Sequence, residues 1–170
     1  LGFNKNSSYI GQGCNLTLFQ KEKHYPVPPE ISKLKRPVIG YTGALDSTRL
    51  DHLIIKTIAA YNPDWQIVLV GPEDEAFLNS DLHELSNIHF LGRKSIEELP
   101  AFVNCFDVCI NPQLMNIVTM GNYPLKIDEY LAMGKPVVAT RTSAMKIFEH
   151  FTYQANKPAE YPELIIQSLA

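Results

Sequence analysis

The chain has 170 residues and a formal net charge of -3 at pH 7, with 45% hydrophobic and 19% charged residues. This length suits one domain with a full hydrophobic core, and the composition is ordinary for a globular protein. The negative charge and the lack of a basic stripe argue against a nucleic-acid partner. The sequence has no apolar run of about 18 residues, the length that a membrane-spanning helix needs. A membrane surface is therefore expected as a partner only through parts of the protein outside this chain.

The first residue and the cysteines indicate the cellular context. Because the chain begins with Leu1 rather than methionine, we expect a fragment of a longer protein. Cys14, Cys105 and Cys109 are odd in number and show no pairing pattern, which favours reduced thiols and a cytoplasmic location. A peripheral position at the inner face of the membrane stays open for the full-length protein. Cys105 and Cys109 have apolar neighbours, so we expect them in the core.

Short apolar runs alternate with helical patterns along most of the chain. The predicted strands are apolar runs bounded mostly by Gly or Pro, which is typical of buried parallel strands, and they are 37–43, 65–70, 88–91, 107–110 and 136–139. The predicted helices are 48–61, 73–85 with a break at 79–81, 95–105, 124–133, 144–151 and 158–170. This alternation predicts an α/β fold with a doubly wound, Rossmann-like parallel sheet.

Local signals refine the ends of these elements. Thr48 is a candidate N-cap for its helix, and Ser95 with Glu98 forms the Ser-x-x-Glu pattern of a capping box. Residues 8–15 are predicted to be a short extended piece that two glycines interrupt. Residues 24–37 are rich in Pro and Lys and are predicted to be an exposed connection.

Candidate binding residues lie in the loops that follow the strands. In open parallel sheets, ligands bind beyond the carboxyl ends of the strands, and four predicted loops share that edge: 42–49, 71–74, 92–95 and 111–123. The last loop is long for this architecture, which is typical of functional or disordered loops. It lacks a carboxylate but contains neutral groups suited to sugar hydroxyls, namely Asn111, Gln113, Asn116 and Thr119.

The helix after Pro124 is the strongest candidate for an anion site. Proline suits the first turn of a helix, where the amides of Leu125 and Lys126 would point outward at the positive end of the dipole. Lys126 either meets the same anion or pairs with Glu129 on a solvated face. Glu129, one turn further along, is placed to bind a sugar hydroxyl. The pattern therefore suits a nucleotide diphosphate, although an ordinary structural helix is the alternative.

The same stretch resembles the signature of GT-B glycosyltransferases of the family-4 kind. Tyr123-Pro124-Leu125 stands at the family's Phe-Gly-Leu/Pro position, Glu129 stands at the second glutamate of its Glu-x7-Glu motif, and Gly134-Lys-Pro-Val-Val-Ala139 closes the pattern. The first glutamate, which holds the donor sugar in the family, would fall at Gly121 and is absent. The stretch is also similar to a bacterial subgroup that lacks this glutamate.

The resemblance implies an architecture and a set of donor-binding residues. Residues 37–170 would be the C-terminal, donor-binding half of a GT-B enzyme, and residues 1–36 a leading segment and linker from the N-terminal half. In the family, the glycine-rich loop after the first strand faces the donor phosphates, Ala44 stands where an arginine is frequent, and Arg49 takes a lysine's place. Arg49 would then supply a cation, with a solvated surface residue as the alternative. The expected donor-binding set is Gly43, Arg49, Lys94, Leu125, Lys126 and Glu129.

The function that the resemblance implies is sugar transfer from a UDP- or GDP-linked donor. The acceptor, a glycan or lipid-linked saccharide, would be bound by the N-terminal half, in the synthesis of a cell-surface glycan or polysaccharide. No cofactor or metal is expected, no catalytic residue is assigned, and this chain alone is expected to be inactive. Two alternatives stay open: a GT-B-type nucleotide-sugar epimerase, and a degenerate domain that binds nucleotide or protein without catalysis, which Gly121 and Ala44 suggest.

Overall fold

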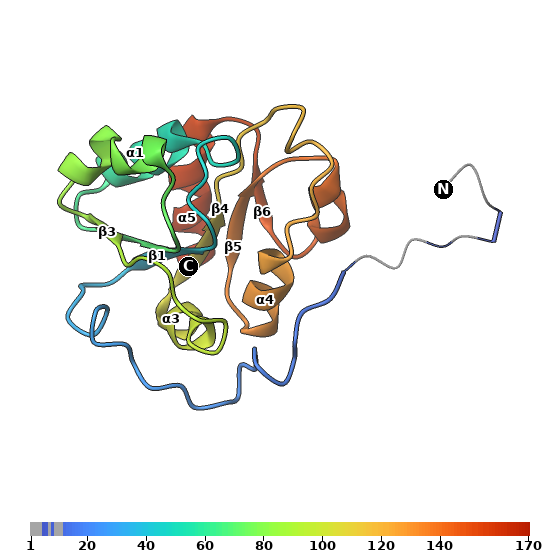
Figure 1. The fold of residues 1–170 in the computed structure, drawn as a ribbon, viewed down its shortest axis with the longest axis horizontal. Helices are drawn as coiled ribbons and strands as arrows, with labels where there is room; N and C mark the ends of the chain where they lie inside the picture. Colours follow the sequence, from blue (N-terminus) through green and yellow to red (C-terminus); the bar gives the residue numbers. More distant parts are fainter. Residues whose placement is uncertain (1–4, 7, 9–11) are drawn as a thin grey trace.

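A computed structural model describes residues 5, 6, 8 and 12–170 of the chain. The predicted extended piece at 8–15 lies partly outside these residues. The chain forms one six-stranded sheet in the order β3-β2-β1-β4-β5-β6, and every neighbouring pair is parallel (Figure 1). The strands are β1 Val38–Thr42, β2 Gln66–Val70, β3 Ile88–Phe90, β4 Val108–Asn111, β5 Val137–Thr140 and β6 Tyr153–Ala155. The predicted doubly wound parallel sheet is confirmed.

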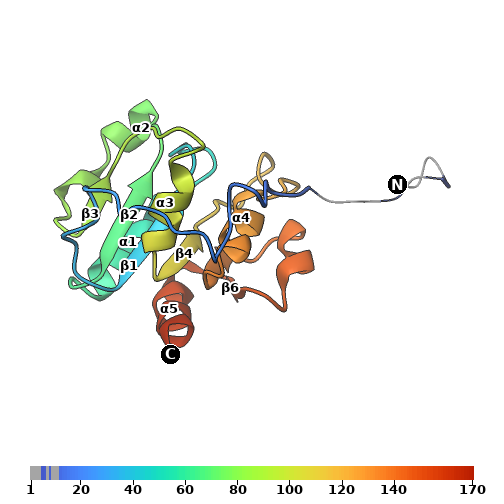
Figure 2. The same cartoon turned by 90° about the horizontal axis from the view of Figure 1, so that it is seen from below.

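Helices cover both faces of this sheet. One face carries α1 (His52–Tyr61) and α5 (Tyr161–Leu169), and the other carries α3 (Leu99–Cys105) and α4 (Lys126–Ala132), as Figure 2 shows. Shorter helical turns fill the connections, and they are α2 Glu75–Leu78, η1 Asp81–Glu84, η2 Ala144–Phe148 and η3 Pro158–Glu160. A break at 79–80 separates α2 from η1, so the predicted break at 79–81 is found but ends one residue earlier.

Each central strand sends side chains into two separate cores. In β1, Ile39 and Tyr41 pack in the core beneath α1 and α5, whereas Val38 packs in the core beneath α3 and α4. A strand buried on both faces reads as a continuous apolar run rather than an alternating one. Cys105 and Cys109 lie in the second core as free thiols, which confirms that expectation.

Helix α1 begins later than predicted, because a competing hydrogen bond takes its expected cap. The Asp46 carboxylate accepts hydrogen bonds from the amide and hydroxyl of Thr48, at 2.9 and 2.6 Å, and holds Thr48 in a turn before the helix. The N-cap is instead Asp51, whose carboxylate accepts from the amide of Leu53 at 2.9 Å. The prediction that Thr48 caps this helix is therefore wrong.

Other boundaries differ for similarly local reasons. Only the glutamate half of the predicted capping box forms: the Glu98 carboxylate accepts from the Ser95 amide at 2.8 Å, and α3 starts at Leu99. The helix predicted at 144–151 is the shorter 3-10 turn η2. Strand β6 was not predicted, because three residues are too few to show a period.

The segment predicted to be an exposed connection is partly a piece of the core. Within 24–37, Tyr25, Pro28 and Ile31 are buried against the face that carries α3. The Tyr25 hydroxyl donates a hydrogen bond to the carbonyl of Leu18 at 2.6 Å, which fixes the path of the chain. The exposed-connection prediction is wrong at these residues, because it rested on Pro and Lys content and overlooked the apolar side chains between them.

Strands β1 and β4 separate before they end, whereas β1 stays beside β2, and a close glycine contact continues beyond these two strands. The β1–β4 ladder stops at Gly40 opposite Cys109, while the β1–β2 ladder continues to Thr42 opposite Val70. Beyond it, the Gly43 amide donates to the Val70 carbonyl at 2.9 Å. A Cβ atom on Gly71 would lie 1.8 Å from the carbonyl oxygen of Gly43, so only glycine fits there.

We therefore expect Gly71→Ala to destabilise the fold by about 1–3 kcal/mol, the usual range for forced overpacking. The matched control is Gly121→Ala, because a Cβ atom there meets nothing within 4 Å. Thermal unfolding of both variants checks this expectation. Equal melting temperatures for the two variants would contradict the contact.

Candidate functional site

Tyr130, a buried residue of α4, fills the gap between the ends of β1 and β4. The hydroxyl of Tyr130 accepts a hydrogen bond from the amide of Thr42 at 2.8 Å and lies 3.1 Å from the Thr42 hydroxyl. The amide of Thr42 lies beyond the last β1–β4 ladder pair, so Tyr130 supplies the partner that the ladder no longer provides. Tyr130 thereby fixes α4 beside the end of β1. Sequence reasoning missed this residue, although a tyrosine on the apolar face of a helix needs a partner for its hydroxyl.

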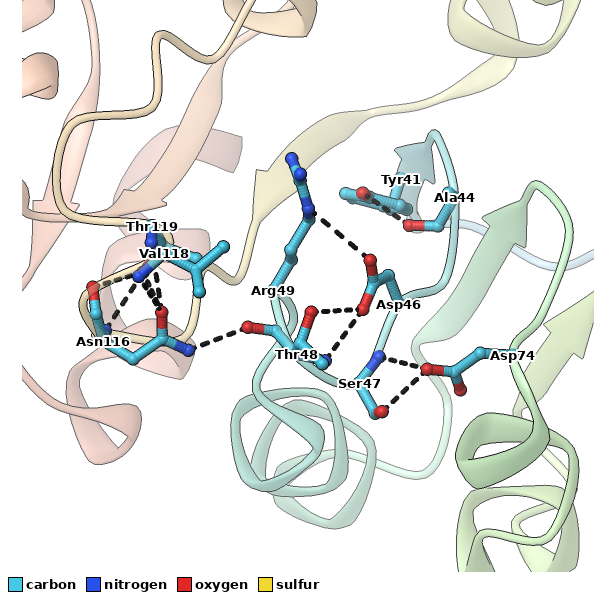
Figure 3. Close-up of polar contacts among 10 residues, drawn as sticks. All are labelled: Tyr41, Ala44, Asp46, Ser47, Thr48, Arg49, Asp74, Asn116, Val118 and Thr119. Carbon is cyan, nitrogen blue, oxygen red and sulfur yellow. Dashed lines mark hydrogen bonds and ion pairs between the residues drawn. The ribbon is translucent and has the colours of Figure 1, made fainter.

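The Asp74 carboxylate ties the loops after β1 and β2 together. Figure 3 shows Asp74 accepting from both the amide and the hydroxyl of Ser47, each at 2.7 Å. The other oxygen of Asp74 accepts from the Phe77 amide at 2.8 Å and caps α2. Hydrogen bonds to the charged form hold the pKa of Asp74 below its usual range, with the Ser47 hydroxyl as the main cause. The loop after β1 is therefore a fixed structure.

The long loop after β4 is held by internal hydrogen bonds and by one hydrogen bond to the loop after β1. The side-chain oxygen of Asn116 accepts from the amides of Val118 and Thr119 at 2.9 and 3.0 Å, and its nitrogen donates to the Thr48 carbonyl at 2.8 Å (Figure 3). The Thr119 hydroxyl donates to the carbonyl of Leu114. Asn116 and Thr119, two of the predicted sugar-binding residues, are therefore occupied in holding the loop.

A cavity of about 130 Å³ lies between the end of β1, the end of β4 and the start of α4. Arg49 and Lys126 both line it, so the structure brings these two predicted cations together. None of the described residues that line this cavity is acidic. The other lining residues are Tyr41, Ala44, Leu50, Asn111, Gln113, Thr119 and Asn122.

Lys126 is partly buried and faces an aromatic ring. Its ammonium nitrogen lies 5.1 Å from the centre of the Tyr41 ring. Burial lowers the pKa of Lys126 to about 8, with Glu129 opposing this shift and Arg49 adding to it. Among the described residues, Lys126 forms no ion pair, so the predicted alternative of a Lys126–Glu129 pair is not found. Its charge is therefore available to an anion in the cavity.

Arg49 reaches the same cavity from the loop after β1. Its Nε atom lies 3.5 Å from the Asp46 carboxylate, and 53% of its side chain is exposed. Figure 3 shows the terminal guanidinium nitrogens pointing away from Asp46. They are the groups with which arginine makes paired contacts to phosphate.

A second cavity, of about 350 Å³, adjoins the first and shares Ala44 with it. Gly43, Gly71 and Lys94 line it, so two further predicted residues lie here. The Lys94 ammonium is already paired with the Glu30 carboxylate at 2.8 Å, which makes it a weaker candidate for ligand binding than the exposed Arg93 beside it.

Leu125 and Glu129 line neither cavity. The Leu125 amide donates to the Tyr123 carbonyl at 3.1 Å, so it does not point outward as predicted. Of the two predicted amides, only the Lys126 amide bonds to no described residue. The cause is a tight turn centred on Pro124, after which α4 starts at Lys126. Burial raises the pKa of Glu129, and Lys126 opposes the shift.

A larger hollow of about 510 Å³ lies away from these loops, between residues 25–30 and α3. Glu30, Glu97 and Glu98 are among its lining residues, and carboxylates disfavour a diphosphate. Within the described part of the chain, no cluster of three or more His, Cys, Asp or Glu is arranged to hold a metal ion. No helix in that part combines the length and hydropathy needed to cross a bilayer.

Comparison with known families identifies the chain. The sequence profile of the family described as "Glycosyl transferases group 1" matches residues 36–170. The chain belongs to this family. Membership argues against the epimerase alternative, and it confirms the resemblance on which the predicted donor site was based.

Relatives of this group 1 glycosyltransferase domain are longer than the chain. The chain is 30% identical over 150 residues to TuaH of Bacillus subtilis (strain 168), a candidate teichuronic acid biosynthesis glycosyltransferase. The aligned region covers 85% of this chain and 37% of TuaH. The chain therefore spans well under half the length of this curated relative.

Solved structures share the fold. Anabaena Alr3699/HepE, crystallised with UDP and glucose, superposes with a TM-score of 0.71 and 21% identity, over 91% of this chain and 45% of that chain. The C-terminal domain of the Francisella tularensis group 1 protein LpcC gives a TM-score of 0.65 and 17% identity, over 91% of this chain and 87% of that one. These similarities confirm the predicted Rossmann-like α/β fold.

The buried tyrosine that joins α4 to β1 yields a stability prediction. Tyr130→Phe would leave the Thr42 amide without a partner, which costs about 1–3 kcal/mol for a buried group. The control is Tyr153→Phe, because the Tyr153 hydroxyl is exposed and makes only a 3.5 Å contact with the Gln167 carbonyl. Urea unfolding measures both. A loss no larger than that of the control would contradict the proposed role of Tyr130.

The lowered pKa of Lys126 predicts a dependence of stability on pH. Burial disfavours the charged form, so the folded pKa of about 8 lies below the ordinary value of 10.5. The cost is fully present below pH 8 and is relieved as the pH rises toward 10.5. We expect Lys126→Met to be more stable than wild type at pH 7, with an advantage that shrinks by pH 10. Urea unfolding at both pH values tests this, and an advantage independent of pH would contradict it.

Proposed function

We propose that this chain is the donor-binding half of an enzyme that transfers sugar from a nucleotide-diphospho-sugar to an acceptor. The observation that carries the proposal is the pair of adjoining cavities at the carboxyl edge of the sheet, with Arg49 and Lys126 in the smaller one. Ligands of open parallel sheets bind at this edge, where the strand order reverses. Here the reversal lies between β1 and β4.

The sizes and charges of the two cavities suit different parts of the donor. The larger cavity, of about 350 Å³, falls within the usual range for small-molecule sites and suits the nucleoside. The smaller one suits the diphosphate end, because two cations converge there without a carboxylate among the described lining residues. Gly43 lines the larger cavity next to the shared residue Ala44, at a φ of 133°, and its backbone would approach the phosphates closely.

In this mechanism, catalysis comes from electrostatic stabilisation of the leaving diphosphate. Negative charge develops on the diphosphate as the bond to the sugar breaks, and cations placed beforehand stabilise that charge. Arg49 would contact phosphate oxygens through its terminal nitrogens, and Lys126 would act as a point charge. We propose that these side chains serve in place of a metal or cofactor. Glu129 and Leu125 line neither cavity, so their donor contacts stay predictions from the family motif.

Relatives guide the choice of donor and pathway. The structure of Alr3699/HepE with UDP and glucose supports UDP as the first nucleotide to test, with GDP second. The name of TuaH supports a role in the synthesis of a cell-surface polysaccharide. The acceptor, a glycan or lipid-linked saccharide, would bind to a further domain. We place the protein in the cytoplasm, since its cysteines are free thiols.

A second candidate function is nucleotide binding without catalysis. It is favoured by Gly121, which is exposed and stands where the family has its sugar-binding glutamate. The two functions share the nucleotide site but differ in whether the complete protein turns over its donor.

Calorimetry with UDP and GDP tests the nucleotide site. We expect Arg49→Ala and Lys126→Met each to weaken binding by about tenfold, the worth of a charge-assisted hydrogen bond. Lys146→Ala is the control, because Lys146 is an exposed cation outside both cavities. No binding of either nucleotide to a folded chain would contradict both candidate functions. Equal effects of all three variants would contradict the placement of the diphosphate.

A further inference from the structure

The side-chain amide of Asn111 is buried at the proposed donor site without a partner. Asn111 is the last residue of β4, is only 2% exposed and lines the smaller cavity together with Arg49 and Lys126. Its nitrogen is one of two buried side-chain polar atoms without a hydrogen bond in the described part of the chain. An unmade hydrogen bond in a buried position destabilises the free protein, so its presence at a ligand site needs an explanation.

The backbone of Asn111 is held on two sides, so the point from which its side chain extends is fixed. Its carbonyl accepts hydrogen bonds from the Tyr161 hydroxyl at 3.0 Å and from the Gln113 amide at 2.9 Å. Asn111 is also paired with Ala139 in the sheet. A side chain on a rigid strand can orient a ligand more accurately than one on a loop.

The other neutral side chains of this region are already committed. Asn116 and Thr119 hold the loop, and the Gln113 nitrogen donates to the Thr119 carbonyl at 2.7 Å. Of the four neutral residues that sequence analysis singled out, only Asn111 has a side-chain amide with no hydrogen bond to a described residue. The side-chain oxygen of Gln113 also accepts none from these residues, and it lines the same cavity.

We propose that the smaller cavity also receives the transferred sugar, and that Asn111 binds one of the hydroxyl groups of that sugar. A neutral amide can donate to a hydroxyl oxygen and accept from its proton, whereas the cations beside it serve the phosphates better. The cavity is too small for a whole nucleotide-sugar, so it takes only the end beyond the nucleoside. This inference rests on the proposed donor site and adds recognition of the sugar to it.

The test compares nucleotides with their sugar conjugates. Calorimetry measures binding of UDP, UDP-glucose, UDP-galactose, UDP-N-acetylglucosamine, GDP and GDP-mannose to the chain and to Asn111→Leu. We expect at least one conjugate to bind more tightly than its nucleotide, and Asn111→Leu to remove about a tenfold preference while leaving nucleotide affinity unchanged. The melting temperature of ligand-free Asn111→Leu should equal or exceed that of wild type, because an unpartnered amide is removed. A purely structural role would lower it.

Controls separate this inference from the proposed function. Asn79→Leu makes the same change at an exposed residue of another region and should alter neither affinity nor preference. If Asn111→Leu does not fold, Asn111→Ser replaces it with the same expected loss of preference. Nucleotide binding without any conjugate preference, or a preference that survives the substitution, would overturn the role of Asn111 and leave the nucleotide site standing. An equal loss for nucleotide and conjugate would reassign Asn111 to the diphosphate.

Discussion

The hydrogen bond between the Tyr130 hydroxyl and the Thr42 amide is the contact on which the site depends. A parallel sheet that reverses its strand order must let two neighbouring strands part, and the parting exposes backbone groups in the interior. Tyr130 resolves this problem and at the same time places the first residue of α4, Lys126, against Gly43 at the end of β1. On the opposite face, the Tyr161 hydroxyl does the same for the carbonyl at the end of β4. Two buried tyrosines, one from each helical layer, therefore support the two strand ends that border the site.

The electrostatics of the site follow from burial rather than from ion pairing. Burial and the nearby Arg49 disfavour the charged form of Lys126, which costs stability in the free protein. Asn111 adds a buried amide without a partner in the described structure. A ligand with several negative charges and hydroxyl groups would offset both costs, because it would pair with Lys126 and bond to the Asn111 amide. Sites of this kind trade stability for function.

Much of the fold could be predicted because its signals are local. Apolar runs mark the central strands, the family resemblance indicates Arg49, and the helix that follows Pro124 indicates Lys126. What failed depended on contacts distant in sequence or on competition between similar groups. Asp51 caps α1 in place of Thr48, because the Thr48 hydroxyl donates its hydrogen bond to Asp46. Tyr25 is buried against residues of α3 and β4, which lie far along the chain. The orphan amide of Asn111 could not be foreseen, since its lack of partners is a property of the packed interior.

The cross-links among the loops after β1, β2 and β4 limit how this family member can change its ligand. Asp74 of the loop after β2 bonds to Ser47, and Asn116 of the loop after β4 bonds to the carbonyl of Thr48. The conformation of each loop therefore depends on its neighbour. A loop transplanted from a relative would arrive without its tethers and disturb two others. Single substitutions at cavity residues that hold no loop, such as Ala44 and Arg93, leave these hydrogen bonds intact. Evolution and engineering of donor preference should therefore proceed by such single substitutions while the loops keep their conformation, rather than by exchange of whole loops.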